Sequence, residues 1–287
     1  MNTPSPLPFP EKSTACIRVL CLGDVVGRPG RQTLEMHLPA LRCRYAVDMV
    51  IANGENAAGG VGLTPETARE LLNAGVDVIT GGNHTWKHRE LYPLLINDLR
   101  ILRPANYPQG SPGKGLCVHK LPNGTRIAVI NLIGRSFMEP LDCPFRAADV
   151  LLAGEELKDT PIRVIDFHAE ASSEKRALAH YVDGKASAVL GTHTHVQTAD
   201  AFVSENGTAS LTDLGMCGVE EGSVLGVTPE PVISRFVKGL PAPFRPAKGP
   251  ATINGALLDI DGDTGKTQTL WLLRGYGESP SVFRSVI

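Results

Sequence analysis

The sequence predicts an α/β protein, because short apolar runs alternate with amphipathic stretches through roughly the first 200 residues. The apolar runs stop at glycine or at a polar residue, as buried strands do. The last third of the chain instead carries longer runs that are typical of antiparallel strands. We therefore expect one domain with βα units first and a hairpin-rich second half.

The strands and helices of the first part follow one another in a regular order. Apolar composition and abrupt ends predict buried strands over residues 17–23, 48–53, 76–80, 162–167 and 186–191. Helices are expected between them, over residues 29–45, 64–74, 86–95 and 172–182. The first helix has Pro29 near its start and Leu34, Leu38 and Leu41 on one face.

The ends of two of these helices are marked by residues with known capping roles. Thr64 and Pro65, with Glu66 after them, are typical of a helix start, and Gly75 is typical of a helix end. Ser172 and Ser173 are candidate caps of the helix over residues 172–182. These residues therefore predict where both helices begin.

The remaining elements are predicted from turn chemistry. Asn123-Gly124 is a strong turn dipeptide and predicts a hairpin between strands over residues 115–121 and 125–133. Antiparallel strands are expected over residues 209–212, 251–261 and 267–274. Residues 238–250 contain four prolines and two glycines, which indicates a long surface loop. That loop is also a candidate contact with a second copy in a homo-oligomer.

Composition excludes several classes of protein. The net charge of −2 gives no extended basic surface for nucleic acid or membrane. The six cysteines form no CxxC pair, so we expect mostly buried free thiols in a reducing compartment. The start of the chain is Pro-rich, which predicts a flexible tail over residues 1–16 before a single domain over residues 17–287. No apolar stretch approaches 18 residues, so a soluble, cytoplasmic protein is expected.

Polar residues able to bind a metal recur just after the predicted strands. They are Asp24, Glu55, Asn56, Asn83, His84, His168, His193 and His195. Carboxyl ends of strands form the ligand crevice of α/β sheets, so these side chains are expected to meet at one edge. A lone Asp is commonly a helix cap, and a lone His commonly structural. Gathering so many of them favours a bound cation, which would neutralise the carboxylates.

The types of ligand indicate the kind of metal. Imidazole, carboxylate and amide oxygen together suit iron, manganese, zinc or nickel rather than a thiolate-bound structural zinc. The count exceeds four, which favours two ions, and a carboxylate such as Glu55 can bridge them. Two ions can bind a phosphoryl oxygen and generate a hydroxide nucleophile near neutral pH. His84 follows Asn83 directly and is a candidate general acid or electrostatic stabiliser.

The motifs resemble those of the calcineurin-like metallophosphoesterases. Gly23-Asp24, the NGEN segment Asn53–Asn56, Gly82–His84, His168 and the THTH segment Thr192–His195 carry the resemblance. The chain departs from the usual pattern of that family at three points. Val26 stands where a His is usual, Glu55 and Asn56 replace an Asp, and Thr85 replaces an acidic residue.

Over roughly residues 17–275 the chain is similar to the YmdB-like branch of that family. The departures carry this similarity, together with the segments GDVVGRPGR (23–31), GENAAGG (54–60), GGNHTW (81–86), DFHAEASSEK (166–175) and TDLGMCG (212–218). The resemblance implies a four-layer αββα sandwich with two mixed sheets. It also implies a dinuclear site, with iron as the expected metal and manganese or zinc as alternatives. The implied activity is a phosphodiesterase acting on small nucleotides, with 2′,3′-cyclic nucleotides as the substrate class.

Roles follow from the resemblance position by position. Asp24, Asn56 and His195 would hold one metal, and Asn83, His168 and His193 the other. Glu55 would bridge the two, and Asn56 would replace the His that Val26 displaces. A hydroxide between the metals would attack phosphorus, and His84 would be the catalytic residue at the leaving ribose oxygen.

Several further residues have two interpretations each. Arg28 and Arg31 either meet a phosphate or form a solvated first helical turn. Trp86 and Phe137 either stack on a base or pack in the core. Glu170 and Lys175 either orient His168 or face solvent, while Asp213 is a candidate acceptor for a ligating imidazole.

Two other kinds of function remain open at this point. A phosphomonoesterase or a nuclease can use the same dinuclear core, although no run of Lys and Arg indicates a nucleic-acid groove. A regulator that binds a nucleotide or RNA with weak turnover is the alternative from another class.

Overall fold

Successive residues of the first strand point into two different apolar cores, which explains why its sequence is apolar throughout. In the computed structural model, which describes residues 12–13, 15–276 and 281–285, β1 spans Cys16–Val25. Val19 and Cys21 face one cluster of buried side chains, and Leu20 and Leu22 face another. A strand with both faces covered lies inside the molecule, not at its surface.

The chain forms two mixed sheets. The seven-stranded sheet has the order β13-β12-β11-β10-β1-β2-β3, in which β1 is parallel to β2 and β10 and antiparallel to β11. The six-stranded sheet has the order β4-β5-β6-β7-β9-β8, in which β5, β6, β7 and β9 run parallel. The other strands are β2 Met49–Asn53, β3 Val78–Thr80, β4 Leu116–Lys120, β5 Arg126–Ile133, β6 Ile162–His168, β7 Ala188–Thr192, β8 Phe202–Val203, β9 Ala209–Leu211, β10 Met216–Val219, β11 Ala251–Asp261, β12 Thr267–Tyr276 and β13 Ser281–Ser285.

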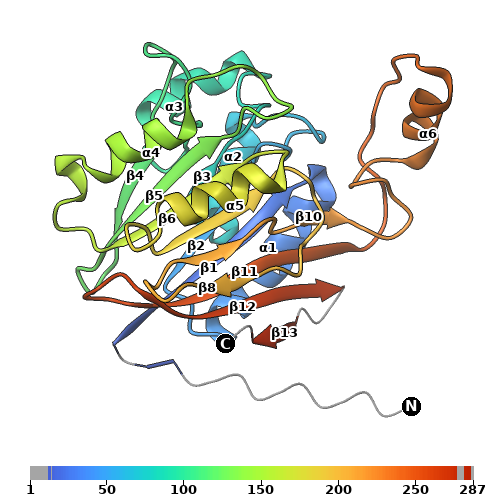
Figure 1. Ribbon diagram of the computed structural model, residues 1–287. Coiled ribbons are helices and arrows are strands. Elements are labelled where there is room, and N and C mark those ends of the chain that lie inside the picture. Colours follow the sequence, from blue (N-terminus) through green and yellow to red (C-terminus); the bar gives the residue numbers. More distant parts are fainter. Residues whose placement is uncertain (1–11, 14, 277–280, 286–287) are drawn as a thin grey trace.

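Three apolar clusters stack these sheets into four layers (Figure 1). One cluster lies between the two sheets, a second joins the seven-stranded sheet to α1 and α2, and a third joins the six-stranded sheet to α4 and α5. The helices are α1 Gly27–Arg44, α2 Pro65–Ala74, α3 Tyr92–Asn97, α4 Pro144–Leu152, α5 Ser172–Tyr181 and α6 Pro229–Lys238. The expected αββα sandwich with two mixed sheets is therefore confirmed.

Most predicted elements are present with ends shifted by a few residues. Thr64 caps α2 through the backbone N–H of Thr67, and Gly75 ends that helix at a φ of 107°. The helix expected over residues 86–95 begins later, because His88 is extended; a 3-10 turn at Arg89–Leu91 precedes α3. The sequence did not predict α4, β8, β10, α6, β13 or the 3-10 turn Glu155–Leu157.

One local prediction holds for one of two partner strands, and another was wrong. The strand over residues 209–212 was expected to be antiparallel, and β9 is antiparallel to the short β8 but parallel to β7. Pairing direction depends on the partner strand, which the local pattern of residues does not reveal. Ser172 and Ser173 do not cap α5, because the N-cap position belongs to Ala171 and no side chain caps it.

The structure also describes the six cysteines and part of the N-terminal segment. All six cysteines are free; Cys43 is exposed, Cys143 is half-buried and the other four are buried. Of the tail expected over residues 1–16, residues 1–11 and 14 lie outside the described residues. The division into a tail and a single domain stays a prediction. Among the described residues, no helix combines the length and apolar character needed to cross a membrane.

Candidate metal centre

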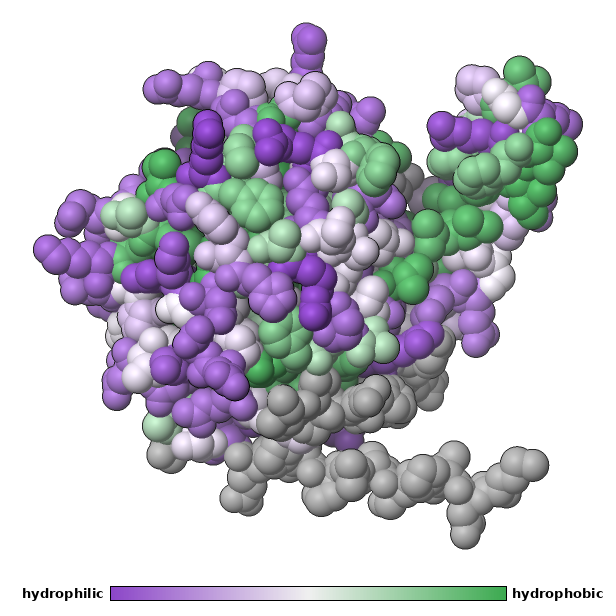
Figure 2. Space-filling view, in the orientation of Figure 1, coloured by the Kyte–Doolittle hydropathy of each residue, from purple (hydrophilic) through white to green (hydrophobic). Residues whose placement is uncertain are grey.

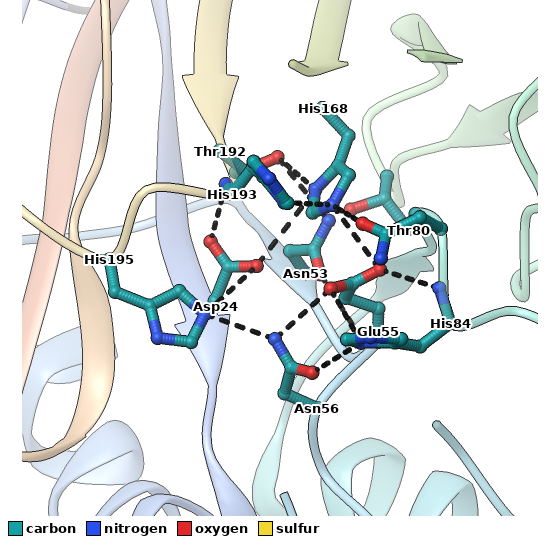
Figure 3. Close-up of polar contacts among 12 residues, drawn as sticks. Asp24, Asn53, Glu55, Asn56, Thr80, His84, His168, Thr192, His193 and His195 are labelled. Atoms are coloured by element: carbon teal, nitrogen blue, oxygen red, sulfur yellow. Dashed lines mark hydrogen bonds and ion pairs between the residues drawn. The ribbon is translucent and has the colours of Figure 1, made fainter. Parts of the chain in front are cut away.

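The predicted ligands meet where the carboxyl ends of strands from both sheets lie side by side. Asp24 comes from the end of β1, His168 ends β6, and His193 follows β7. Asp24 Oδ2 accepts a hydrogen bond of 3.0 Å from the backbone N–H of His193, which joins the two sheets at this point. Figure 3 shows the side chains of the site converging from these strand ends.

One half of the site surrounds the buried ring of His168. Its Nε2 lies 3.2 Å from Glu55 Oε2, 2.9 Å from Asn83 Oδ1 and 3.1 Å from His193 Nδ1. Ligand atoms of Glu55, His168 and His193 all lie within 4.8 Å of one another, a spacing at which one ion can contact all three. The three residues of the predicted second metal site are therefore neighbours, with Glu55 beside them.

The other half of the site lies on the far side of Glu55. Asn56 Nδ2 is 3.1 Å from Glu55 Oε1 and 3.0 Å from His195 Nε2, and that nitrogen is 3.8 Å from Asp24 Oδ1. The amide of Asn56 directs its Oδ1 to His84 Nδ1 at 2.8 Å. A half-turn of this amide exchanges its two atoms and presents the oxygen, which is the atom that ligates metals.

The chemistry of these residues fits a bound cation. Asp24 Oδ1 is fully buried and, among the residues that the structure describes, has no hydrogen-bond partner. Glu55 is also buried, so two carboxylates are removed from water within one cluster. Buried charges of this kind require a counter-charge, which a metal supplies. Glu55 contacts both halves of the predicted ligand set, through Oε2 to His168 and through Oε1 to Asn56.

The carboxylates and imidazoles perturb one another strongly. Burial raises the pKa of Asp24 to about 6, although His195 and His168 act in the opposite direction. Burial also opposes ionisation of Glu55, but His168 and His84 together outweigh it and hold the pKa of Glu55 well below its usual value. Burial alone would lower the pKa of His168, yet Glu55 and Asp24 raise it to about 9. Burial and the charge on His168 lower the pKa of His193 to about 3, which keeps that ring neutral for ligation.

Each histidine is oriented through the ring nitrogen that faces away from the cluster. His168 Nδ1 lies 2.9 Å from Thr192 Oγ1, and that hydroxyl donates to the buried carboxylate of Asp166 at 2.7 Å. His193 Nε2 is 3.0 Å from Glu170 Oε2, and His195 Nδ1 is 2.9 Å from the carbonyl oxygen of Leu225. Such partners fix the tautomer and leave the other nitrogen to bind the metal.

The backbone around the cluster leaves little freedom. A Cβ at Gly82 would lie 2.2 Å from Glu55 Oε2 and 2.4 Å from His168 Nε2, so only glycine fits there. His193 and His195 adopt positive φ values of 103° and 65°, which L-residues seldom do. Strain of this kind at a cluster of polar residues is typical of functional sites.

The candidate contacts to phosphate and base lie in different surroundings. Arg31 is held by Glu70 and by the carbonyl oxygen of Ala57, and Arg28 is exposed; both line a neighbouring cavity. Trp86 packs edge-on against Tyr92 and Tyr107. Phe137 is 91% exposed and is not a core residue.

Three predicted supporting residues have contacts other than those expected. Glu170 contacts His193 and not His168. Lys175 is buried and pairs with Asp213, which accepts from the backbone of Thr194 and not from an imidazole. The supporting roles of Asp166 and Thr192 behind His168 were not predicted from the sequence, although both residues lie in the strands β6 and β7 that end at the site.

The chain is similar to proteins of one family along most of its length. A model of the family described as YmdB-like protein matches residues 20–271. The chain is 50% identical over 250 residues to a 2′,3′-cyclic-nucleotide 2′-phosphodiesterase of Bacillus subtilis (strain 168), covering 87% of this chain and 94% of the relative. It is 36% identical to a putative phosphatase/phosphodiesterase of Mycoplasma genitalium, covering 90% of this chain and 92% of that protein.

Solved structures agree with the sequence relatives. A hypothetical protein from Thermus thermophilus superposes with a TM-score of 0.84 at 45% identity, covering 91% of this chain and 99% of that one. A novel phosphatase from Mycoplasma pneumoniae gives a TM-score of 0.85 at 34% identity, covering 93% and 95%. The resemblance drawn from the motifs is thereby confirmed, and the chain belongs to the YmdB-like family of phosphoesterase-fold proteins.

Proposed function

We propose that this protein is a metal-dependent phosphodiesterase that hydrolyses small nucleotides, with 2′,3′-cyclic nucleotides as its substrate class. The activity named for the Bacillus subtilis relative, which is 50% identical to this chain, supports this substrate class. The observation that supports the metal dependence is the ligand set divided about Glu55, together with the buried Asp24 Oδ1, which accepts no hydrogen bond from the described residues.

The contacts of the site residues support two metal positions. Asp24, Asn56 and His195 would hold one ion, while Asn83, His168 and His193 would hold the second. Glu55 would contact both. When bound, two ions supply an activated water and positive charge at the phosphoryl oxygens.

His84 is placed to act on the substrate itself. Its Nδ1 lies 2.8 Å from Asn56 Oδ1 and 3.1 Å from Glu55 Oε1, which fixes the plane of the ring. The side chain is 28% exposed and lines the cavity in front of the cluster, so its second ring nitrogen is available to a ligand. From there His84 can protonate the ribose oxygen that leaves phosphorus, or stabilise the charge that develops on it.

The test compares turnover and metal content in the same variants. His84→Ala is expected to keep its metal and to hydrolyse 2′,3′-cyclic AMP about 10²-fold more slowly, the contribution of a general acid–base group. His119→Ala, on β4 and outside the cavity, is the matched control and is expected to behave as wild type. Near-normal turnover of H84A would refute the role of His84.

A second variant and a substrate panel test the rest of the proposal. Glu55→Gln is expected to lose metal, measured by elemental analysis; an unchanged metal content would contradict the bridging position. The panel contains 2′,3′-cyclic AMP, 3′,5′-cyclic AMP, a phosphomonoester and a short RNA, each with manganese or iron(II). Hydrolysis of the monoester or the RNA alone would favour the phosphomonoesterase or the nuclease. Absence of any hydrolysis would favour a binding protein.

A further inference from the structure

The helix α6 stands away from the body of the molecule, between β10 and β11 (Figure 1). We refer to residues 225–247, which contain this helix, as the arm. Within α6 only Val232 is buried, while Ile233, Phe236 and Val237 are 56%, 85% and 77% exposed. Figure 2 shows hydrophobic side chains over this arm and over the segments that join it to the body. A group of apolar side chains exposed to solvent on one helix indicates a binding surface.

The inner side of the arm faces the metal centre across a cavity of about 830 Å³. Glu55, Asn56, Asn83, His84, His193 and His195 form one side of this cavity. Val232, Arg235, Phe236 and Phe244 line it from the arm. One cavity therefore combines the candidate metal centre with two aromatic rings and a guanidinium.

The root of the arm is attached to the metal centre directly. Leu225, at the start of the arm, accepts the contact from His195 Nδ1 at 2.9 Å. Backbone hydrogen bonds from Thr228 to Arg245 and from Ala247 to Gly226, of 2.9 and 2.8 Å, close the root. The root of the arm is thus held in place by the predicted ligand His195, as expected if the arm forms one side of the same site.

We propose that the arm binds the nucleobase of the substrate, with Phe236 and Phe244 as stacking surfaces and Arg235 beside them. This inference rests on the proposed function, since it assigns the part of a nucleotide that the metal centre does not hold. Every base has a π-face, so aromatic rings bind bases with little sequence preference. The Arg235 guanidinium lies 5.5 Å from the centre of the Phe244 ring and adds a cationic surface.

The dimensions of the cavity and the charge of the arm agree with this occupant. A cavity of about 830 Å³ falls in the range of small-molecule and cofactor sites and is far larger than a phosphate alone needs. Residues 226–246 carry three basic side chains and one acidic side chain, in a protein whose net charge is −2. The arm is therefore locally positive, as suits an anionic ligand.

The experiment compares a cyclic phosphate that has a base with one that has none. Phe236→Ala is expected to lower kcat/KM for 2′,3′-cyclic AMP by roughly tenfold or more, the contribution of one base–aromatic stack. Its kcat/KM for glycerol 1,2-cyclic phosphate and its metal content are expected to stay at wild-type values. Phe236→Trp retains a stacking face and is expected to retain activity on 2′,3′-cyclic AMP.

Val237→Ala is the matched control, because Val237 is exposed on the same helix but does not line the cavity. It is expected to match wild type on both substrates. Equal losses of F236A on both substrates, or no loss on either, would overturn the proposal. A loss shared by F236A and V237A, with a change of molecular mass in light scattering, would assign the arm to contact with a second copy instead.

A binding measurement separates this inference from the proposed function. Fluorescence of the F236W variant is expected to be quenched by adenosine 3′-monophosphate and not by glycerol 1-phosphate. Quenching without turnover of any cyclic phosphate would refute the phosphodiesterase and leave the base-binding arm supported. Turnover of 2′,3′-cyclic AMP without quenching would refute the arm and leave the phosphodiesterase supported.

Discussion

The ion pair between Lys175 and Asp213 supports the loop that carries two predicted ligands. Lys175 Nζ donates to Asp213 Oδ2 at 2.7 Å, and the two side chains are 2% and 0% exposed. Asp213 also accepts from the backbone N–H of Thr194 at 3.0 Å and of Gly215 at 2.8 Å. Lys175→Met keeps most of the buried volume but removes the cation, which leaves the Asp213 carboxylate buried without a counter-charge.

The expected loss follows from that burial. Breaking a buried pair by removing one partner costs about 3–5 kcal/mol, because the remaining charge stays in the interior. We expect this loss in the free energy of unfolding, measured by urea titration of metal-free protein. Lys158→Met is the matched control, because Lys158 is 74% exposed and lies 4.0 Å from an exposed Glu155; its expected change is within about 0.5 kcal/mol.

Two results would refute the reasoning about this pair. A loss below about 1 kcal/mol for K175M would mean that the pair behaves like an exposed one. The double variant K175M/D213N replaces both charges with neutral groups and is expected to recover part of the stability lost by K175M. A double variant less stable than K175M would show that the buried negative charge is not the cause of the loss.

Two further predictions concern metal binding. In the metal-free protein the pKa of His168 is raised to about 9 and that of Asp24 to about 6. At a pH below its pKa each group carries a proton, which a metal ion must displace in order to bind there. Manganese affinity is therefore expected to rise about tenfold per pH unit from pH 6 to 9, and more steeply with pH below pH 6. Calorimetry in buffers of different ionisation enthalpy measures the protons released. An affinity that does not change with pH would contradict these pKa shifts. Gly82→Ala places a Cβ 2.2 Å from Glu55 Oε2 and is expected to abolish metal binding with the circular dichroism spectrum retained; a normal metal content in elemental analysis would show that the loop can move aside.

The positions of the predicted ligands could be read from the sequence because strand ends and glycines are local features. Asp24, Glu55 and His168 each follow an apolar run that forms a buried strand, and parallel strands bring their carboxyl ends to one edge. Gly82 explains why such a motif needs glycine, since the cluster occupies the space of its side chain. Both features depend only on residues near one another in the chain.

Features that depend on distant partners could not be read in the same way. The Lys175–Asp213 pair joins residues 38 positions apart, and neither belongs to a motif that predicts the other. The arm was missed because α6 lies beside the Pro-rich residues 238–250, whose composition indicates a loop. Apolar periodicity normally identifies the face of a helix that meets the core, but most of the apolar side chains of α6 are exposed.

The loop of His193, Thr194 and His195 connects three parts of the molecule in consecutive residues. Asp24 accepts from the backbone of His193, Asp213 from that of Thr194, and Leu225 from the side chain of His195. These contacts hold two histidines at positive φ, a conformation that costs of order 1–3 kcal/mol per residue and persists only where its surroundings enforce it. The candidate metal centre, the buried ion pair and the root of the arm at Leu225 therefore meet at one short loop, so a change in the ion pair or at this root is expected to reach the predicted ligands.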